Sequence, residues 1–341
     1  MGPQALTARV VELLASGKGS TGDLTVKPCA VGGNNRVFIV TTGGTTLIAK
    51  WYFSHPSDTR DRLKAEFSFL SYAAQIGIDC VPRPISCDPE RNIGLYEFID
   101  GSKLASSQIT EHHIDQAITF FLRLNDLSCV LFAEGLPVAS EGCFSIADHF
   151  LLIDGRIDRL AAINPRSRID AEAADFVTIL LASWQRLKTR IVGQAQKLGI
   201  GLDTKLPKEE RCFSPSDFGF HNALLRPSGD ICFIDFEYAG WDDPAKMAGD
   251  FFCHPAIPVN TVHFDRFVDV TMRFSRRADA LIDRVRLLFP VFQTKWCCII
   301  LNDFLPDSAR SRKFADPDFD EDERKRSQLD RAKRLFDSIQ H

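Results

Sequence analysis

The chain has 341 residues, of which 45% are hydrophobic and 25% are charged, and its formal net charge is −4 at pH 7. This length and composition are those of a globular protein with a sizeable core and more than one domain or lobe. The negative charge argues against a surface dedicated to nucleic acid, and no apolar run approaches the ~18 residues of a membrane-spanning helix, so we expect neither partner.

A short β-rich region is predicted near the start of the chain, after an amphipathic helix at residues 3–16. Residues 25–52 are rich in β-branched and aromatic residues, and a Gly-Gly pair separates two strand-like segments. A helical pattern follows over 57–76, with Leu63, Phe67, Leu70 and Ala74 at helical spacing and with Ser57 or Asp58 as the expected N-cap. Two further strand-like segments, VPRPISCD and GLYEFID, complete a β-β-β-α-β-β order.

After Gly101 the pattern changes from strands to helices. One strand-rich island at 210–236 interrupts the helices, and a charged segment at 306–326 is expected to be a solvated loop. This combination predicts an α+β fold, because a doubly wound sheet would alternate strand and helix throughout. The predicted helices span residues 110–125, 144–163, 170–199, 260–276, 279–304 and 321–339.

Ten cysteines are scattered along the sequence, and none of them forms a C-x-x-C pair. A zinc site is therefore poorly supported. Several cysteines lie in apolar runs, as Cys232 does in ICFIDF, which favours buried thiols in the reducing environment of the cytoplasm.

The strand-rich island carries the residues with the clearest chemical meaning. Asp217 and Asn222 precede the strand-like NALL, a turn PSGD follows, and the apolar strand ICFI ends at Asp235. A hairpin places the end of its second strand beside the start of its first, so Asp235 should lie near Asn222. The alternative interpretation is that Asp217 is a turn residue and Asp235 a strand-end charge, although an unpaired carboxylate within ICFIDF would be costly if buried.

Two carboxylates and one amide in a small volume suit phosphoryl transfer. One carboxylate orients the attacking hydroxyl and accepts its proton, while an amide oxygen and a second carboxylate hold Mg²⁺ against the phosphates. The D-x-x-x-x-N pair followed by IDFE resembles the catalytic and metal-binding segments of the aminoglycoside phosphotransferase and choline kinase superfamily. The Asp-Phe-Glu triplet is especially similar to the choline/ethanolamine kinase version.

The resemblance implies a two-lobed, protein-kinase-like fold, with an N-terminal nucleotide-binding lobe at 1–100 and a mainly helical lobe at 101–341. It also implies that Asp217 is the catalytic base and that Asn222 and Asp235 are magnesium ligands.

The N-terminal region supports the same interpretation. Lys50 lies inside the apolar strand TLIAKWYF and must either extend to solvent or meet a partner. Glu66 follows on the predicted helix, and the superfamily pairs a strand lysine with a helix glutamate so that the ammonium faces the α- and β-phosphates. The alternative is an edge-strand lysine and a surface acid.

Two further segments occupy nucleotide-binding positions by resemblance. GGNNRVF lies where the phosphate-covering loop is expected, although an ordinary hairpin turn would look the same. LYEFIDG resembles the segment that joins the lobes, whose backbone binds the adenine edge. The residues concerned are Gly33, Asn34, Asn35, Arg36, Glu97, Phe98 and Ile99.

Two positions qualify the resemblance. Pro215 stands where the superfamily usually has a histidine that holds the catalytic loop, and His221 is either a substitute for it or a structural histidine. Asp250 matches a carboxylate that braces the catalytic loop, with a solvated helix cap as the alternative.

Acids and aromatic residues after Asp235 are the candidate substrate contacts. Glu237 and Asp242 would suit a cationic substrate, and Tyr238 and Trp241 would stack on an ammonium group or a sugar. A solvated turn and ordinary packing are the alternatives, because GWDDP has the composition of a turn.

The sequence therefore predicts a small-molecule kinase that uses ATP or GTP with Mg²⁺. The acceptor is a hydroxyl of an amino alcohol, an aminoglycoside or a sugar. The alternative is a nucleotide-binding pseudokinase or scaffold, which the Pro215 departure favours. A protein kinase is disfavoured because no A-P-E signature follows Asp235.

Overall fold

The computed structural model describes residues 24–29, 35–53, 60–128, 133, 135–305 and 321–339. Contacts divide the chain into two compact units. The first contains the described residues up to Ser140 together with Pro215–Gly240, and the second contains 141–214 and the described residues from 241 onward. The predicted division into lobes at residue 100 stays a prediction, and the predicted helix at 3–16 lies outside the described residues.

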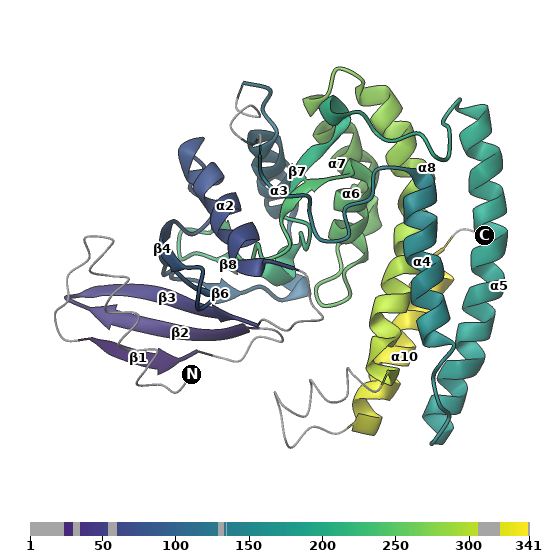
Figure 1. Ribbon diagram of the computed structural model, residues 1–341, viewed down its shortest axis with the longest axis horizontal. Coiled ribbons are helices and arrows are strands. Elements are labelled where there is room, and N and C mark those ends of the chain that lie inside the picture. The colour runs from purple at the N-terminus through teal and green to yellow at the C-terminus, as the bar shows by residue number, and fades with distance from the viewer. Residues whose placement is uncertain are drawn as a thin grey trace. The chain divides into compact units, whose positions relative to one another are not determined.

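The first unit is built on a five-stranded antiparallel sheet with the strand order β1-β2-β3-β5-β4. In Figure 1, β1, β2 and β3 lie side by side. Gly43 and Gly44 both have positive φ, as a two-residue hairpin turn between β2 and β3 requires. The strands are β1 (Thr25–Pro28), β2 (Asn35–Thr42), β3 (Thr45–Tyr52), β4 (Pro84–Asp88) and β5 (Ile93–Glu97).

Helix α2 (Arg62–Gln75) lies between β3 and β4 in the chain, as predicted. The helix begins later than the pattern indicated, because Asp61 is the N-cap and accepts a hydrogen bond from the backbone N–H of Lys64. The predicted caps, Ser57 and Asp58, lie outside the described residues.

A phenylalanine cluster joins a hairpin to two helices within the first unit. The hairpin consists of β8 (Ala223–Leu225) and β9 (Ile231–Phe233), and β6 (Ser102–Lys103) pairs with β8. Phe120 of α3 (Glu111–Leu124) stacks on Phe233, with ring centroids 4.8 Å apart. Phe236 stacks on Phe69 of α2 at 4.3 Å. This packing fixes the chain on both sides of Asp235.

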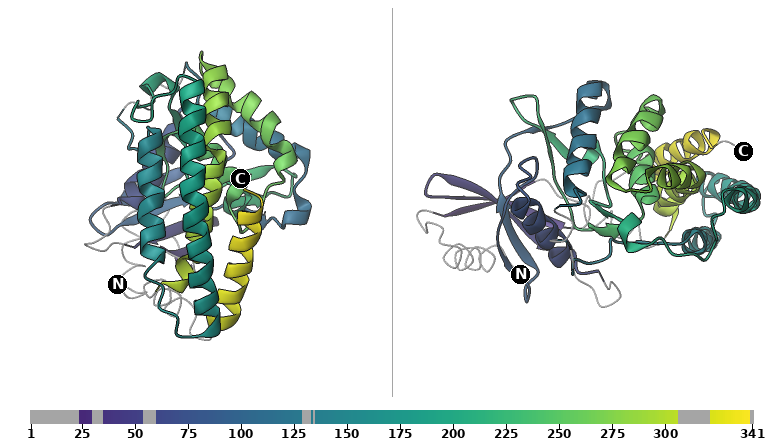
Figure 2. Two further views of the ribbon diagram at one scale, coloured as in Figure 1. Left: turned by 90° about the vertical axis from the view of Figure 1, so that its right-hand side faces the viewer. Right: turned by 90° about the horizontal axis from the view of Figure 1, so that it is seen from above.

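The second unit is mainly helical. Figure 2 shows α4, α5, α8 and α10 running side by side, in agreement with their contacts. Ser145 and Ser167 cap the first two of these helices. The helices of this unit are α4 (Ile146–Leu160), α5 (Arg168–Lys197), α6 (Pro244–Cys253), α7 (Phe264–Thr271), α8 (Ala278–Leu301) and α10 (Glu321–Asp337). Strand β7 (Cys212–Ser214) pairs with β10 (Gly240–Asp242) in a two-stranded sheet.

The predicted α+β class, with a small antiparallel sheet and a larger helical part, is confirmed. Three details were wrong. Residues 321–326, which the loop expected at 306–326 included, belong to helix α10 (Glu321–Asp337). Helix α6 was not predicted, because GWDDP has the composition of a turn; Asp243 is instead the N-cap and Pro244 occupies the first turn of the helix. The single helix predicted at 260–276 consists of α7 between two 3₁₀ turns.

None of the helices in the described ranges combines the length and the apolar character needed to cross a bilayer. The nine cysteines that the structure describes are free thiols, five of them buried.

Candidate functional site

Lys50 is the cationic centre of the candidate site. It lies on β3 opposite Gly94 of β5, and its side chain is 13% exposed. Its ammonium donates to Glu66 Oε1 at 2.7 Å and to Asp235 Oδ1 at 2.9 Å. Burial on its own would lower the pKa of Lys50, but the charges of Asp235 and Glu66 outweigh it, so the pKa is raised and the lysine stays charged. The predicted contact between Lys50 and Glu66 is therefore present.

Two tyrosines that the sequence did not single out complete the surroundings of Glu66. The Tyr52 hydroxyl donates to Glu66 Oε2 at 2.6 Å and lies 2.7 Å from the Tyr96 hydroxyl. Burial and the negative charge of Glu66 raise the pKa of Tyr52 well above its ordinary value, so the hydroxyl stays protonated. The available signal was strand periodicity, because Tyr52 follows Lys50 by two residues and so projects from the same face of β3.

The hairpin brings the three predicted oxygen donors into one region. The backbone N–H of Ile234 donates to the backbone carbonyl of Asn222 at 2.8 Å, which places Asp235 next to that residue in the ladder. The Asn222 side-chain amide donates to Asp217 Oδ2 at 3.2 Å and to the Asp217 carbonyl at 3.1 Å. The predicted juxtaposition of Asp217, Asn222 and Asp235 is therefore present within the first unit.

Asp235 adopts a backbone conformation that few residues accept. Its φ is +71°, in the left-handed region where Asp and Asn are tolerated better than most other non-glycine residues. Ser216, beside Asp217, is also left-handed, with φ at +65°. Such conformations persist only where the surrounding packing fixes them, and they concentrate at functional sites.

Asp235 and the two residues after it contact three different parts of the first unit. Asp235 binds Lys50 of β3, and Phe236 stacks on α2. The carboxylate of Glu237 accepts a hydrogen bond from the Asn35 amide at 2.6 Å, at the start of β2. The triplet is therefore held at each position, which fixes the direction of the Asp235 side chain.

The chemistry of the donor set fits Mg²⁺. Among the described residues, Asn222 Oδ1 and Asp235 Oδ2 accept no hydrogen bond, since the contacts of these side chains use Asn222 Nδ2 and Asp235 Oδ1. The Asp235 side chain is 38% exposed, so solvent reaches it. An amide oxygen and a carboxylate oxygen are the hard ligands that Mg²⁺ takes while it keeps several waters.

The predicted nucleotide-binding segments are only partly described. Gly33 and Asn34 lie outside the described residues. Asn35 contacts Glu237, and the Arg36 guanidinium lies 5.4 Å from the centroid of the Trp51 ring. The structure thus ties Asn35 to the segment that carries Asp235.

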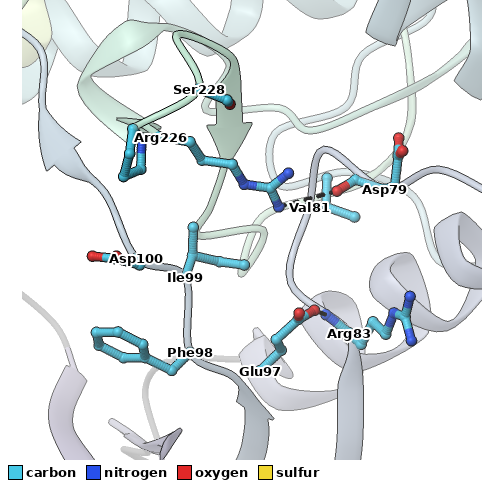
Figure 3. Close-up of a pocket in the computed structure, with 10 residues that line it drawn as sticks. Asp79, Val81, Arg83, Glu97, Phe98, Ile99, Asp100, Arg226 and Ser228 are labelled. Atoms are coloured by element: carbon cyan, nitrogen blue, oxygen red, sulfur yellow. Dashed lines mark hydrogen bonds between the residues drawn. The ribbon is translucent and has the colours of Figure 1, made fainter.

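Residues Glu97, Phe98 and Ile99 border a cavity of about 490 Å³ within the first unit. Figure 3 shows Glu97 extending toward Arg83 on one side of this cavity and Arg226 extending toward Asp79 on the other. Glu97 accepts from the backbone N–H of Arg83 at 3.1 Å. Its side chain is therefore engaged locally, which leaves any adenine contact to the backbone of the segment.

The candidate substrate acids do not fit their expected role. Glu237 is 5% exposed and pairs with Arg62, whose Nε lies 3.6 Å from Glu237 Oε2. Asp242 is fully buried and accepts from the Lys246 ammonium at 2.7 Å. Both carboxylates are neutralised by cations of the chain itself, so their expected function as an acidic patch for a cationic substrate loses its basis.

The candidate aromatic contacts also have partners in the chain. The Tyr238 ring faces two arginines, Arg60 at 5.5 Å and Arg62 at 5.9 Å, and Trp241 packs edge-to-face on Phe213. A ring that already faces guanidinium groups is a poor site for a further cation.

Asp250 is a buried member of an ion-pair network in the second unit. It accepts from Lys295 Nζ and Trp296 Nε1, both at 2.8 Å, and Lys246 Nζ lies 3.3 Å away. Burial alone would raise its pKa, but Lys295 and Lys246 hold it below the ordinary value. The alternative of a solvated helix cap is wrong, because the residue is 3% exposed.

Comparisons with known proteins agree with this geometry. The choline kinase from Cryptosporidium parvum Iowa II is 14% identical, with 97% of this chain and 96% of that chain covered and a TM-score of 0.58. A choline/ethanolamine kinase family protein from Mesorhizobium loti is 17% identical, with 99% and 96% covered and a TM-score of 0.60. A spectinomycin phosphotransferase bound to AMP is 12% identical, with 98% and 99% covered and a TM-score of 0.62. At such identities the likeness shows a shared fold.

No curated protein matches the sequence. The sequence model described as the phosphotransferase enzyme family matches residues 25–246, which is more than half of the chain and includes every residue of the Lys50 and Asp217 clusters described above. The resemblance inferred from the motifs is confirmed: the chain belongs to the phosphotransferase enzyme family.

Proposed function

We propose that this protein is a small-molecule kinase, which transfers the γ-phosphoryl group of ATP or GTP to a hydroxyl. The observation that carries the proposal is the position of the Lys50 ammonium, which contacts Glu66 at 2.7 Å and Asp235 at 2.9 Å. A lysine held in this way keeps its charge and its direction, and both are needed to bind phosphate oxygens.

The nucleotide is held by the strand lysine and by backbone groups. Lys50 faces the α- and β-phosphates, and Glu66 with Asp235 fixes its direction. The adenine or guanine edge hydrogen-bonds the backbone between Glu97 and Ile99. Within the described part of the chain, the Ile99 backbone N–H makes no hydrogen bond, so it is available to a base.

Mg²⁺, when bound, would be held by Asn222 and Asp235 and would neutralise charge on the phosphates.

Asp217 orients the acceptor and takes its proton. As the acceptor oxygen forms its bond to the γ-phosphorus, the bond from that phosphorus to the bridging oxygen breaks and the nucleoside diphosphate leaves. The proton of the hydroxyl passes to the Asp217 carboxylate. That carboxylate is 30% exposed and is held by the Asn222 amide, so it is both reachable and oriented.

The proposed acceptor is a small molecule with a hydroxyl group. The similar structures include choline kinases and a spectinomycin phosphotransferase, which supports screening amino alcohols, aminoglycosides and sugars. The burial and internal pairing of Glu237 and Asp242 remove an acidic patch as a reason to prefer a cationic acceptor, so the similarity of the Asp-Phe-Glu triplet is the reason that remains. The test is a screen of these three groups for stimulated, magnesium-dependent ADP or GDP release, with the phosphorylated product identified by mass.

A nucleotide-binding pseudokinase is the second candidate, and the specific observation in its favour is Pro215 in the catalytic loop. It predicts that the protein binds ADP with Mg²⁺ and yet releases no ADP from ATP with any compound of the screen. A single phosphorylated product would exclude it.

A further inference from the structure

His221 contacts the carboxylate to which the proposed function assigns the proton transfer. In the sequence it lies in the 3₁₀ turn Phe220–Asn222, which follows Asp217 and precedes strand β8. Its Nε2 lies 3.2 Å from Asp217 Oδ1, and its side chain is 11% exposed. The other carboxylate oxygen, Oδ2, accepts from the Asn222 amide.

We propose that His221 is a positioning residue that holds Asp217 in the orientation needed to receive the acceptor hydroxyl. The proposal rests on the proposed function and adds a residue to it. A carboxylate only accepts hydrogen bonds, so the Nε2–H group of His221 is the donor in this contact and Asp217 Oδ1 is the acceptor. Each oxygen of Asp217 then accepts at least one hydrogen bond, from His221 or from Asn222, and together these contacts restrict rotation of the carboxylate.

The backbone at His221 is itself held by neighbouring elements of the first unit. The Lys103 ammonium donates to the His221 backbone carbonyl at 2.9 Å from strand β6, which pairs with β8 (Figure 1). On the other side, Phe220 is fully buried and makes an edge contact with His113 of α3. The backbone at His221 is thus anchored from two directions.

Gly219 makes room for the ring. A Cβ at this position would lie 2.8 Å from His221 Nδ1 and 3.1 Å from Cε1, closer than a relaxed contact allows. The φ of Gly219 is 164°, which is ordinary extended backbone, so its lack of a side chain is explained by the histidine and not by strain. Gly219 therefore offers a way to displace the ring without removing it.

Pro215 explains why the loop needs this support. Its side chain has no hydrogen-bonding group, so it cannot orient Asp217 from the preceding side of the loop. His221 supplies a donor from the following side, four residues after the carboxylate that it contacts.

The experiment compares His221→Ala, His221→Gln and Gly219→Ala with the native chain. His112→Ala is the matched control, because this exposed histidine lies on α3 and contacts Gln116. For each variant, calorimetry gives the Kd for Mg·ADP, turnover gives kcat and KM for ATP with the best acceptor of the screen, and thermal unfolding gives Tm.

We expect His221→Ala to lower kcat about 100-fold while the Kd for Mg·ADP and the KM for ATP change less than about twofold, because a small misplacement of a reacting group has this effect. Gly219→Ala should lower kcat in the same way although the histidine is present. His221→Gln should recover part of the loss, because its amide can donate from a similar position. His112→Ala should behave as the native chain.

Native turnover in His221→Ala would overturn the proposal and leave the proposed function standing. Equal losses of kcat, nucleotide affinity and Tm in His221→Ala, without recovery in His221→Gln, would also overturn it, because they mark a structural role. If the native chain releases no ADP with any acceptor, the proposed function fails and the role of His221 falls with it.

Discussion

The Asp235 carboxylate lies 2.9 Å from the Lys50 ammonium, although 185 residues separate them in the sequence. The contact joins the end of the β8–β9 hairpin to the central region of the five-stranded sheet within one compact unit. It places the proposed phosphate ligand beside a proposed magnesium ligand, as transfer from a metal-bound nucleotide requires.

Lys50→Met should weaken the binding of Mg·ADP and lower turnover, each by about 100-fold or more, because it removes the positive charge that is proposed to bind the phosphates. The substitution should also lower the free energy of unfolding, because the buried Glu66 loses its cationic partner. The hydrogen bond from the Tyr52 hydroxyl to Glu66 remains. Lys64→Met is the control, because Lys64 is an exposed lysine on α2, near Glu66 in the sequence. Unchanged nucleotide affinity in Lys50→Met would contradict the phosphate role.

Asp235→Asn should remove the dependence of nucleotide binding on Mg²⁺ with little loss of fold. Asparagine tolerates the left-handed backbone that φ of +71° imposes, so the variant separates the charge from the conformation. The measurement is the Kd for ADP with and without Mg²⁺, which should converge in the variant. Asp158→Asn on the exposed side of α4 controls for the loss of one charge. A magnesium dependence equal to that of the native chain would remove Asp235 from the metal site.

Glu237→Ala should destabilise the protein by about 3–5 kcal/mol, because it leaves the buried Arg62 without this carboxylate. Glu237→Gln should cost less, since its amide oxygen still accepts from Asn35. Urea unfolding measures both. Native stability with an affinity loss confined to cationic acceptors would restore the substrate role that burial argues against.

Asp243 should make the second unit sensitive to acid. Burial alone would raise its pKa, but Arg284, 2.6 Å away, and His149 hold it well below the ordinary value of 3.8. Because the folded-state pKa is depressed, the stabilisation is present above about pH 4 and is lost as the pH falls below it.

Asp243→Asn should therefore lower the free energy of unfolding by about 3–5 kcal/mol near neutral pH, and the difference from the native chain should shrink below about pH 4. Chemical unfolding across this range measures the difference. A difference that stays constant between neutral and acidic pH would show that the charge of Asp243 does not provide the stabilisation.

The hairpin and the proximity of the proposed magnesium ligands Asn222 and Asp235 could be predicted, because the residues concerned are close in the sequence. A turn between two short strands brings Asp235 beside Asn222 whatever the rest of the chain does, and the ladder hydrogen bond from Ile234 shows this. The strand lysine and helix glutamate were found through resemblance, since nothing local pairs residues that lie on different elements.

The buried face of α2 could not be derived from hydrophobic spacing alone. The pattern indicated Leu63, Phe67, Leu70 and Ala74, whereas Phe69 and Ala73 are buried with Leu63 and Leu70, Phe67 is half-buried and Ala74 is exposed. The reason is Glu66, a charged residue that faces inward because Lys50 and Tyr52 bind it. Hydrophobic spacing assigns a charged residue such as Glu66 to the exposed face of the helix, and the predicted buried face is displaced as a result.

The burial of the candidate substrate acids Glu237 and Asp242 was not predicted for a related reason. A carboxylate is expected at the surface unless its partner is known, and the sequence does not reveal that Arg62 pairs with Glu237 from α2. Lys246 lies only four residues after Asp242, but the pairing requires helix α6, which the turn-like composition of GWDDP concealed.

Magnesium-dependent ADP release is the most direct measure of the central claim, which is that Asp217 acts on an acceptor beside a nucleotide held by Lys50. The comparison is between the native chain, Asp217→Asn and Asp230→Asn, an exposed turn aspartate that undergoes the same chemical change. We predict that Asp217→Asn lowers kcat by about 100-fold or more while it still binds Mg·ADP, and that Asp230→Asn releases ADP at the native rate. Equal ADP release from Asp217→Asn and the native chain would contradict the account.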